Sequence, residues 1–139
     1  MKALILAGGK GSRIQEITKG ESKNVLEVYG KPLVEYNLDQ AVRIGVKEII
    51  IVLCHKPKEI INAIGKKYKG IKVTYIIEKE GKGLVNAIWN ARKALGGSDF
   101  FLMLGDEIVQ EGNIKGMFED FHRKEAMVTC GIVLEKDKS

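Results

Sequence analysis

Short apolar runs alternate along the chain with segments whose apolar residues recur every three or four positions. Runs of strand length, rich in Ile, Val and Leu, predict buried β-strands because few polar residues interrupt them. Apolar residues at the wider spacing predict amphipathic helices. The predicted strands are Lys2–Ala7, Glu48–Cys54, Ile71–Ile77, Asp99–Leu104 and Ala126–Leu134.

Helices are expected between these strands. Pro32 suits a first helical turn and Gly45 suits a helix end, so they delimit one expected helix. We also expect a helix after the glycine-rich segment that follows the first strand. The helix between Pro32 and Gly45 carries Leu33–Val42. Further helices are expected over the residues from Pro57 to Ile64, over Leu84–Leu95 before a glycine pair, and around Met117, Phe118 and Phe121 after a capping Asn113.

Continuously apolar strands are typical of a parallel sheet covered on both faces, and strand–helix alternation connects such sheets. We therefore predict an α/β fold: a three-layer αβα sandwich with a mainly parallel, Rossmann-like sheet, formed by residues 1–139 as a single domain. Ligands bind such sheets beyond the carboxyl ends of the strands. The residues expected on that rim are Gly8 to Arg13, His55, Glu78 to Gly83 and Asp106.

The composition is that of a folded protein rather than a disordered one, since 45% of the 139 residues are hydrophobic and 29% are charged. No apolar run approaches the roughly 20 residues of a membrane helix, and the run after Met1 is too short for a signal peptide. We therefore predict a cytoplasmic protein with no membrane partner. Cys54 and Cys130 lie inside apolar runs and are expected to be buried free thiols.

The net charge of +5 comes from 23 lysines and arginines that are spread along the chain. No basic patch with interleaved aromatic residues is present in the sequence, so no nucleic-acid partner is expected. Phosphorylated small molecules account for the positive charge equally well.

A glycine-rich segment follows the first predicted strand. Gly8, Gly9 and Gly11 leave backbone N–H groups unhindered, and such groups can bind a phosphate. Arg13 adds a planar, charged hydrogen-bond donor next to them. The segment is therefore a candidate phosphate-binding loop.

Two common phosphate-binding loops do not match this segment. A Walker A loop needs Gly-Lys-Ser/Thr at a fixed spacing, and Ile14 takes the place of the third glycine of a dinucleotide-binding loop. For the glycines alone, a tight turn that only joins two elements is an equally good interpretation. Ser12, Arg13 and Lys23 favour the phosphate-binding one.

Three ordered motifs span most of the chain. The first is Leu6 to Ile14 followed by Thr18, Lys23, Leu26 and Gly30-Lys31-Pro32; the second is Glu78–Ala87; the third is Leu102–Asp106. They resemble L-A-G-G-x-G-[ST]-R-[LM]-x-P-x-T-x-x-x-P-K-x-L-x-x-x-x-G-K-P, Q-x-x-P-x-G-[LT]-A-x-A and a strand-ending Gly-Asp of the sugar-phosphate nucleotidyltransferases. The amino-acid sequences of these motifs are most similar to those of the glucose-1-phosphate thymidylyltransferase branch.

The resemblance implies the nucleotide-diphospho-sugar transferase fold and an enzyme that moves a nucleotidyl group from a nucleoside triphosphate, UTP or dTTP, to a sugar-1-phosphate. Pyrophosphate is released, and Mg²⁺ is the implied cofactor. Such transfer depends on positioning and charge neutralisation and needs no protein nucleophile.

The resemblance also implies the roles of particular residues. Asp106 would hold Mg²⁺, Arg13 and the glycine N–H groups would hold the leaving pyrophosphate, and Lys23 would contact the α-phosphate or the sugar phosphate. The implied catalytic residues are thus Arg13, Lys23 and Asp106. The implied nucleotide-binding residues are Leu6, Ala7, Gly8, Gly9, Gly11, Ser12, Glu78, Gly83 and Asn86.

Some positions depart from the family pattern. Glu16 and Ser22 replace two prolines, and Glu78 replaces a glutamine that reads the base. An ionised carboxylate only accepts hydrogen bonds, so Glu78 suits N3–H of uracil or thymine but also the amino groups of cytosine or guanine. The alternatives are a cytidylyltransferase for another phosphorylated alcohol and a non-catalytic regulatory module that binds a nucleotide or nucleotide sugar.

The resemblance covers only the half of the family's protein chain that binds the nucleotide. We expect a chain that lacks the C-terminal sugar-binding part and a second acidic magnesium ligand, either as a fragment or as a naturally short module. As a fragment, its last strand would leave an unpaired sheet edge, which favours association into a homo-oligomer.

Overall fold

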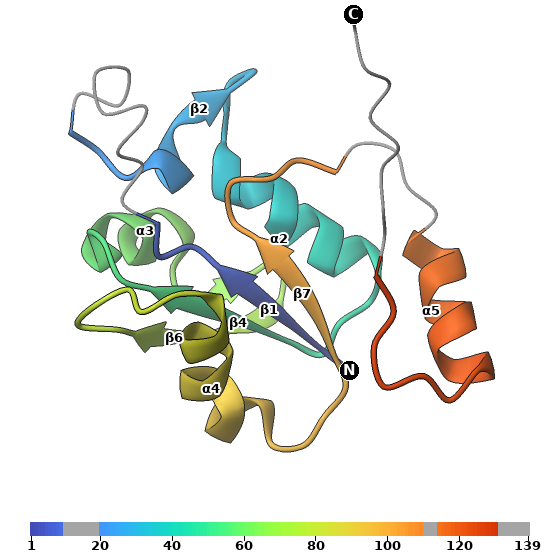
Figure 1. Ribbon diagram of the computed structural model, residues 1–139. Helices are drawn as coiled ribbons and strands as arrows, with labels where there is room; N and C mark the ends of the chain where they lie inside the picture. The colour runs from blue at the N-terminus through green and yellow to red at the C-terminus, as the bar shows by residue number, and fades with distance from the viewer. Residues whose placement is uncertain (10–19, 110–113, 131–139) are drawn as a thin grey trace, which may run out of the picture. The chain divides into compact units, whose positions relative to one another are not determined.

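The computed structural model describes residues 1–9, 20–109 and 114–130. Its central element is a mostly parallel β-sheet (Figure 1). The described strands of the sheet lie in the order β5-β6-β4-β1-β7. The strands β1 (Lys2–Leu6), β4 (Glu48–Leu53), β6 (Ile71–Ile77) and β7 (Phe100–Leu104) run parallel, and the short edge strand β5 (Lys67–Tyr68) is antiparallel to β6. The predicted α/β class and mainly parallel sheet are confirmed.

Helices cover both faces of this sheet. The helices are α2 (Leu33–Arg43), α3 (Pro57–Ile64) and α4 (Leu84–Leu95), and Figure 1 shows α2 and α3 on one face and α4 on the other. Their boundaries agree with the glycine and proline signals: Pro57 lies in the first turn of α3, and α4 ends at Gly96 in the left-handed conformation. The predicted three-layer arrangement is confirmed.

Successive residues of each strand enter different cores. Ala3 and Ile5 pack in the cluster that contains Leu38 of α2 and Ile60 of α3. Leu4 packs instead in the cluster on the α4 face. Because side chains alternate across a strand, a sheet covered on both faces needs apolar residues at every position, which explains the uninterrupted apolar runs.

The chain divides into two compact units, residues 1–109 and residues 110–139. The first contains the sheet and α2 to α4. The second contains α5 (Ile114–Arg123), the helix expected after Asn113, while Asn113 itself lies outside the described residues. In the part of the chain that the structure describes, every helix is too short or too polar to cross a bilayer.

Two short antiparallel strand pairs are not predicted by the sequence pattern. One is β5 with β6, and the other joins β2 (Glu27–Val28) to β3 (Lys31–Pro32) through Tyr29 and Gly30, which have φ values of 52° and 74°. Two-residue strands are too short to show a period. Because Pro32 pairs in this hairpin, it caps α2 instead of lying in its first turn as expected.

The prediction of a last strand over Ala126–Leu134 is wrong for those of its residues that the structure describes. Residues 126–130 form no strand, and residues 131–134 lie outside the described residues. A strand needs a partner strand for its backbone hydrogen bonds, and the described residues of the second unit provide only α5. The apolar run alone does not reveal this.

Two further expectations concern the cysteines and the glycine-rich segment. Both cysteines are free, as predicted, but Cys54 is half-buried and Cys130 is exposed, so the expected burial is wrong. The helix expected after the glycine-rich segment falls on residues 10–19, which lie outside the described residues.

Candidate functional site

The loops that follow β1, β4, β6 and β7 meet at one edge of the sheet, because the carboxyl ends of parallel strands lie together (Figure 1). Backbone hydrogen bonds hold the loops to neighbouring strands: Ala7 N donates to Val52 O, and Gly105 N donates to Leu6 O, each at 2.9 Å. The described members of the predicted rim therefore share one edge. Gly11, Ser12 and Arg13 lie outside the described residues.

Two glycines let these loops approach one another closely. A Cβ atom added to Gly8 would lie 3.2 Å from Cβ of Cys54, and one added to Gly105 would lie 2.9 Å from Oδ1 of Asn24 and 3.0 Å from Cβ of Ala7. Contacts this short require a shift of the neighbours. The glycines therefore have a packing role at the rim in addition to any role in phosphate binding.

Lys23 and Asp106 form an ion pair on this rim. Lys23 opens the short 3-10 helix η2 (Lys23–Val25), and Asp106 follows β7, so the pair joins segments 83 residues apart. A Cβ atom on Gly9 would lie 3.1 Å from Lys23 Nζ, which places the ammonium group against the glycine-rich loop. The side chain of Lys23 is 17% exposed and that of Asp106 is 41% exposed. A mostly buried cation and a partly exposed carboxylate thus lie together beside the glycine-rich loop.

Asp106 fits the chemistry of a Mg²⁺ ligand. Mg²⁺ prefers oxygen ligands and is usually held by one or two carboxylates, with water and substrate phosphates filling the other positions. Within the described ranges, no cluster of three or more His, Cys, Asp or Glu could hold a metal ion by itself. A single partly exposed carboxylate therefore suits a metal that arrives with a phosphorylated ligand.

Buried polar residues fix the segment that carries Lys23. Ser22 and Asn24 are 1% and 0% exposed, respectively. Ser22 N donates to Oε2 of Glu59 at 2.8 Å, and Nδ2 of Asn24 donates to Ala7 O at 2.9 Å. The Ser22 N–H, helped by Lys56, holds the pKa of Glu59 below its ordinary value. These contacts join η2 to α3 and to the loop after β1.

A second group of predicted residues surrounds a pocket beside the N-terminal half of α4. Glu78 is 8% exposed, and its Oε1 accepts from Nδ2 of Asn90 at 2.6 Å. Nδ2 of Asn90 also donates to Oδ1 of Asn86 at 3.0 Å. The pocket has a volume of about 630 Å³ and is lined by Ile76, Ile77, Glu78, Lys79, Glu80, Lys82, Asn86 and Asn90.

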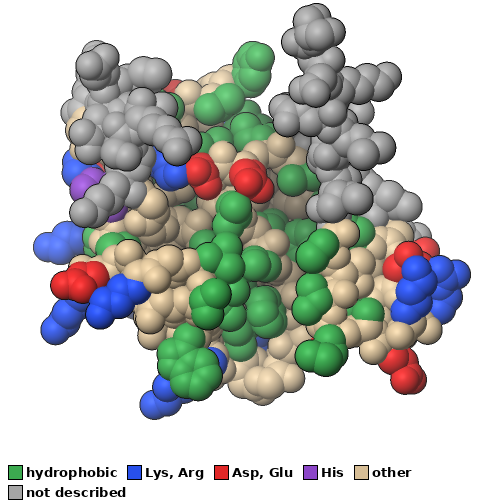
Figure 2. Space-filling view, viewed as in Figure 1, with side chains coloured by type: hydrophobic (Ala, Val, Ile, Leu, Met, Phe, Trp, Pro, Cys, Tyr) green, Lys and Arg blue, Asp and Glu red, His purple; other side chains and the backbone are tan. Residues whose placement is uncertain are grey.

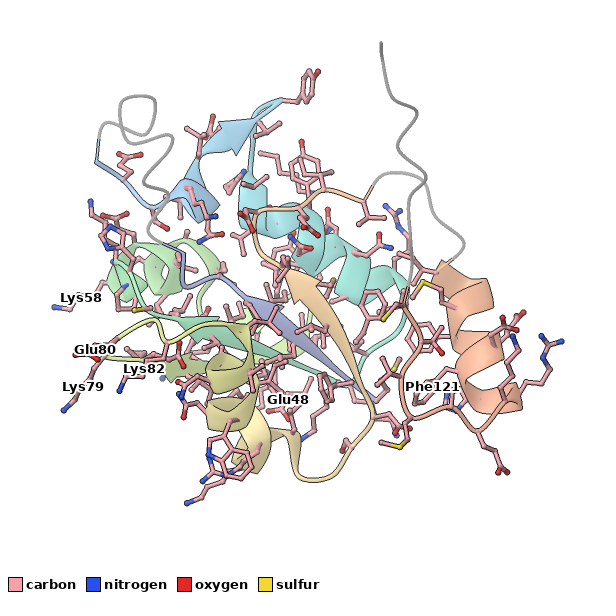
Figure 3. The ribbon with its side chains drawn as sticks, in the orientation of Figure 1. Glu48, Lys58, Lys79, Glu80, Lys82 and Phe121 are labelled. Atoms are coloured by element: carbon pink, nitrogen blue, oxygen red, sulfur yellow. The ribbon has the colours of Figure 1, made fainter. Side chains whose placement is uncertain are left out.

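The loop between β6 and α4 gives this pocket a charged border. Figure 3 shows Lys79, Glu80 and Lys82 on this loop. Gly83 ends the loop with a φ of 92° and caps α4. Over α4, apolar side chains also reach the surface (Figure 2), with Val85 79% and Trp89 61% exposed. The pocket therefore combines a buried carboxylate and amides with lysines at its border.

The structure thus places the predicted site residues in two groups. In the first group, Lys23 and Asp106 form the ion pair, Gly9 lies against Lys23, Ala7 binds the neighbouring Asn24, and Gly8 packs against Cys54. Glu78 and Asn86 line the pocket, Gly83 lies at the start of α4, and Leu6 packs in the core cluster on the α4 face.

Sequence reasoning misses Asn90 and Glu59. Asn90 lies one helical turn after Asn86, a spacing that could have placed both amides on one face of α4. Glu59 could not have been found, because its contact with Ser22 joins residues that are distant in sequence.

Comparisons with known proteins agree with this arrangement. Residues 2–139 match the family model described as nucleotidyl transferase. The chain is 37% identical over 108 residues to a UTP–glucose-1-phosphate uridylyltransferase of Haloferax volcanii, covering 78% of this chain and 44% of that protein. It is 33% identical over 131 residues to a glucose-1-phosphate thymidylyltransferase of Streptomyces antibioticus, covering 92% of this chain and 37% of that protein.

A solved structure shows the same fold. A Bacillus anthracis protein assigned as a glucose-1-phosphate thymidylyltransferase superposes with a TM-score of 0.82 and 26% identity, covering 90% of this chain and 51% of that one. The chain therefore spans less than half the length of these two curated relatives and about half of this structure.

Proposed function

Because the chain belongs to the nucleotidyl transferase family, we propose that it transfers a nucleotidyl group from UTP or dTTP to a sugar-1-phosphate. The observation that carries the proposal is the ion pair of Lys23 and Asp106 against the glycine-rich loop. Relatives named as uridylyltransferases and thymidylyltransferases of glucose-1-phosphate support the two triphosphates and this class of acceptor.

The reaction makes and breaks one bond at the α-phosphorus. An oxygen of the sugar phosphate attacks the α-phosphorus, and the bond to the bridging oxygen of the β-phosphate breaks, so pyrophosphate leaves with that electron pair. The protein must neutralise and align the phosphates. In the proposed mechanism the N–H groups of the glycine-rich loop and Arg13 bind the leaving pyrophosphate, and Lys23 donates to the α-phosphate.

Asp106 is the proposed ligand of Mg²⁺. When bound, the ion would neutralise phosphate charge that the protein's own cations leave uncompensated. Lys23 would then exchange its carboxylate partner for a phosphate oxygen. The ion pair therefore keeps both groups on the rim in the free protein.

The pocket beside α4 is the proposed site for the base and ribose. Glu78 presents an acceptor that suits N3–H of uracil or thymine, and Asn90 holds one of its oxygens. Asn86 lines the same pocket, and Gly83, Leu6 and Ala7, which are not part of its lining, are proposed to contact the nucleotide from the start of α4 and from the end of β1 and the loop after it.

Calorimetric titration with UTP, dTTP, CTP, GTP and ATP, with and without Mg²⁺, tests this function. We expect UTP or dTTP to bind selectively, and to bind tightly only when Mg²⁺ is present. Asp106→Asn should lower the Mg²⁺-dependent affinity on the order of tenfold or more and leave the fold intact. Glu107→Gln, which changes the neighbouring exposed carboxyl group, is the matched control.

A pyrophosphate-release assay with glucose-1-phosphate then tests turnover. Release that depends on Asp106 supports the transferase. Unchanged Mg²⁺-dependent affinity in Asp106→Asn would contradict the metal assignment. Selective binding of CTP would point to the cytidylyltransferase, and nucleotide binding with no pyrophosphate release would point to the regulatory module.

A further inference from the structure

Lys23 and Asp106 come from two segments that extend beyond the sheet. Lys23 lies in η2, which is outside the sheet, and Asp106 lies in the loop after β7. Their side chains meet across 83 residues of sequence. Something other than strand pairing must therefore hold the two backbones at this separation.

Asn24 holds the Lys23 side. Its side chain is fully buried between the loop after β1 and the loop after β7, where Nδ2 donates to Ala7 O at 2.9 Å. Oδ1 faces Gly105 and has no hydrogen-bond partner among the described residues. A buried amide oxygen without a partner in the described part of the chain costs stability there, so burial of a polar residue at this position is not explained by stability alone.

Asn37 holds the Asp106 side. It lies in α2, is 5% exposed, and donates from Nδ2 to the backbone oxygen of Glu107 at 3.1 Å. That bond anchors the residue that directly follows Asp106. The two buried asparagines thus contact the segments that carry the two members of the ion pair.

We propose that Asn24 and Asn37 are positioning residues that hold Lys23 and Asp106 at ion-pair distance on the rim. Both contact backbone oxygens beside the pair and neither forms part of the pair itself. The consequence for nucleotide binding rests on the proposed function, but the geometric role does not. Loss of either amide should let the two charged groups separate while the core remains packed.

Heteronuclear NMR of lysine ammonium groups in the full chain tests the geometric role. We expect pairing with Asp106 to slow hydrogen exchange of the Lys23 ammonium group, and the variant Lys23→Met assigns its signal. We expect this signal to disappear in Asn24→Leu and Asn37→Leu although both still unfold cooperatively, and to return in part in Asn24→Gln. Tyr75→Phe, which removes a similar side-chain bond to Gly65 O outside the rim, should keep it.

Calorimetry with UTP and Mg²⁺ measures the functional consequence. The two leucine variants should bind on the order of tenfold more weakly than Tyr75→Phe. If Asn24→Leu does not fold, Asn24→Asp and Asn37→Leu report on the same role. An unchanged Lys23 signal in a folded variant without the amide overturns the proposal. If the wild type binds no nucleotide but the signal is lost as expected, the proposed function fails and the positioning role stands.

Discussion

Gly105 shows, at the scale of one residue, how packing determines the composition of the rim. Its Cα lies where an added Cβ would come within 2.9 Å of Asn24 Oδ1 and 3.0 Å of Ala7 Cβ. The loop after β7 can pass the loop after β1 only without a side chain at this position. The glycine that precedes Asp106 thus lets the carboxylate reach Lys23.

Gly105→Ala should therefore destabilise the protein by about 1–3 kcal/mol, because the added methyl group overpacks a rim whose neighbours are buried. Gly81→Ala is the matched control, since its Cβ would lie 3.8 Å from Sγ of Cys54, an ordinary contact. Urea denaturation of both variants measures the difference. Equal stabilities would show that the rim relaxes around the added methyl.

At the scale of elements, Glu48 links three neighbouring strands at the amino end of the sheet. Its carboxylate pairs with Lys2 of β1 at 3.2 Å and with Lys72 of β6 at 2.9 Å, and it accepts from Oγ1 of Thr74 at 2.8 Å. The Lys72 and Thr74 contacts lower the pKa of Glu48 from 4.5 to about 2, against the opposing effect of burial.

A depressed pKa in the folded state stabilises the protein above the unfolded value, and this stabilisation is lost as the pH falls from about 5 towards 2. Glu48→Gln should therefore lower the free energy of unfolding by roughly 1–2 kcal/mol at pH 7 and by progressively less as the solution is acidified. Denaturation between pH 7 and pH 3 checks this, with the exposed Glu27→Gln as control. A difference independent of pH would contradict the assignment.

At the scale of the whole molecule, the chain forms two compact units. Both core clusters belong to residues 1–109, and so does every described strand of the sheet. The ion pair and the pocket also lie within this unit. The first unit therefore contains its own core and the described part of the candidate site.

Residues 1–109 expressed alone should accordingly unfold in one cooperative transition. Thermal denaturation and amide NMR spectra of this shortened chain check the prediction. We expect the dispersed signals of Leu4, Ile50 and Val52 to persist, because their packing partners in α4 remain. Loss of cooperative unfolding would show that the second unit is needed to complete the fold.

Much of the fold could be predicted because its signals are local. Apolar runs marked β1, β4, β6 and β7, and helical spacing with glycine and proline boundaries marked α2, α3 and α4. Elements of two residues have no period, so β2, β3 and β5 could not be predicted. The run from Ala126 has strand composition, but its described part lacks a partner strand.

The sequence by itself determined the layered α/β class and which loops reach the rim, because the apolar pattern and the order of elements specify both. Only the tertiary structure decided that Lys23 meets Asp106, that Asn90 holds Glu78, and that Asn24 and Asn37 flank the ion pair. The Lys23–Asp106, Asn24 and Asn37 contacts join residues distant in sequence, and the Asn90–Glu78 contact depends on how the loop after β6 lies against α4. Such contacts form once the sheet has brought the loops together, and no local pattern of residues encodes them.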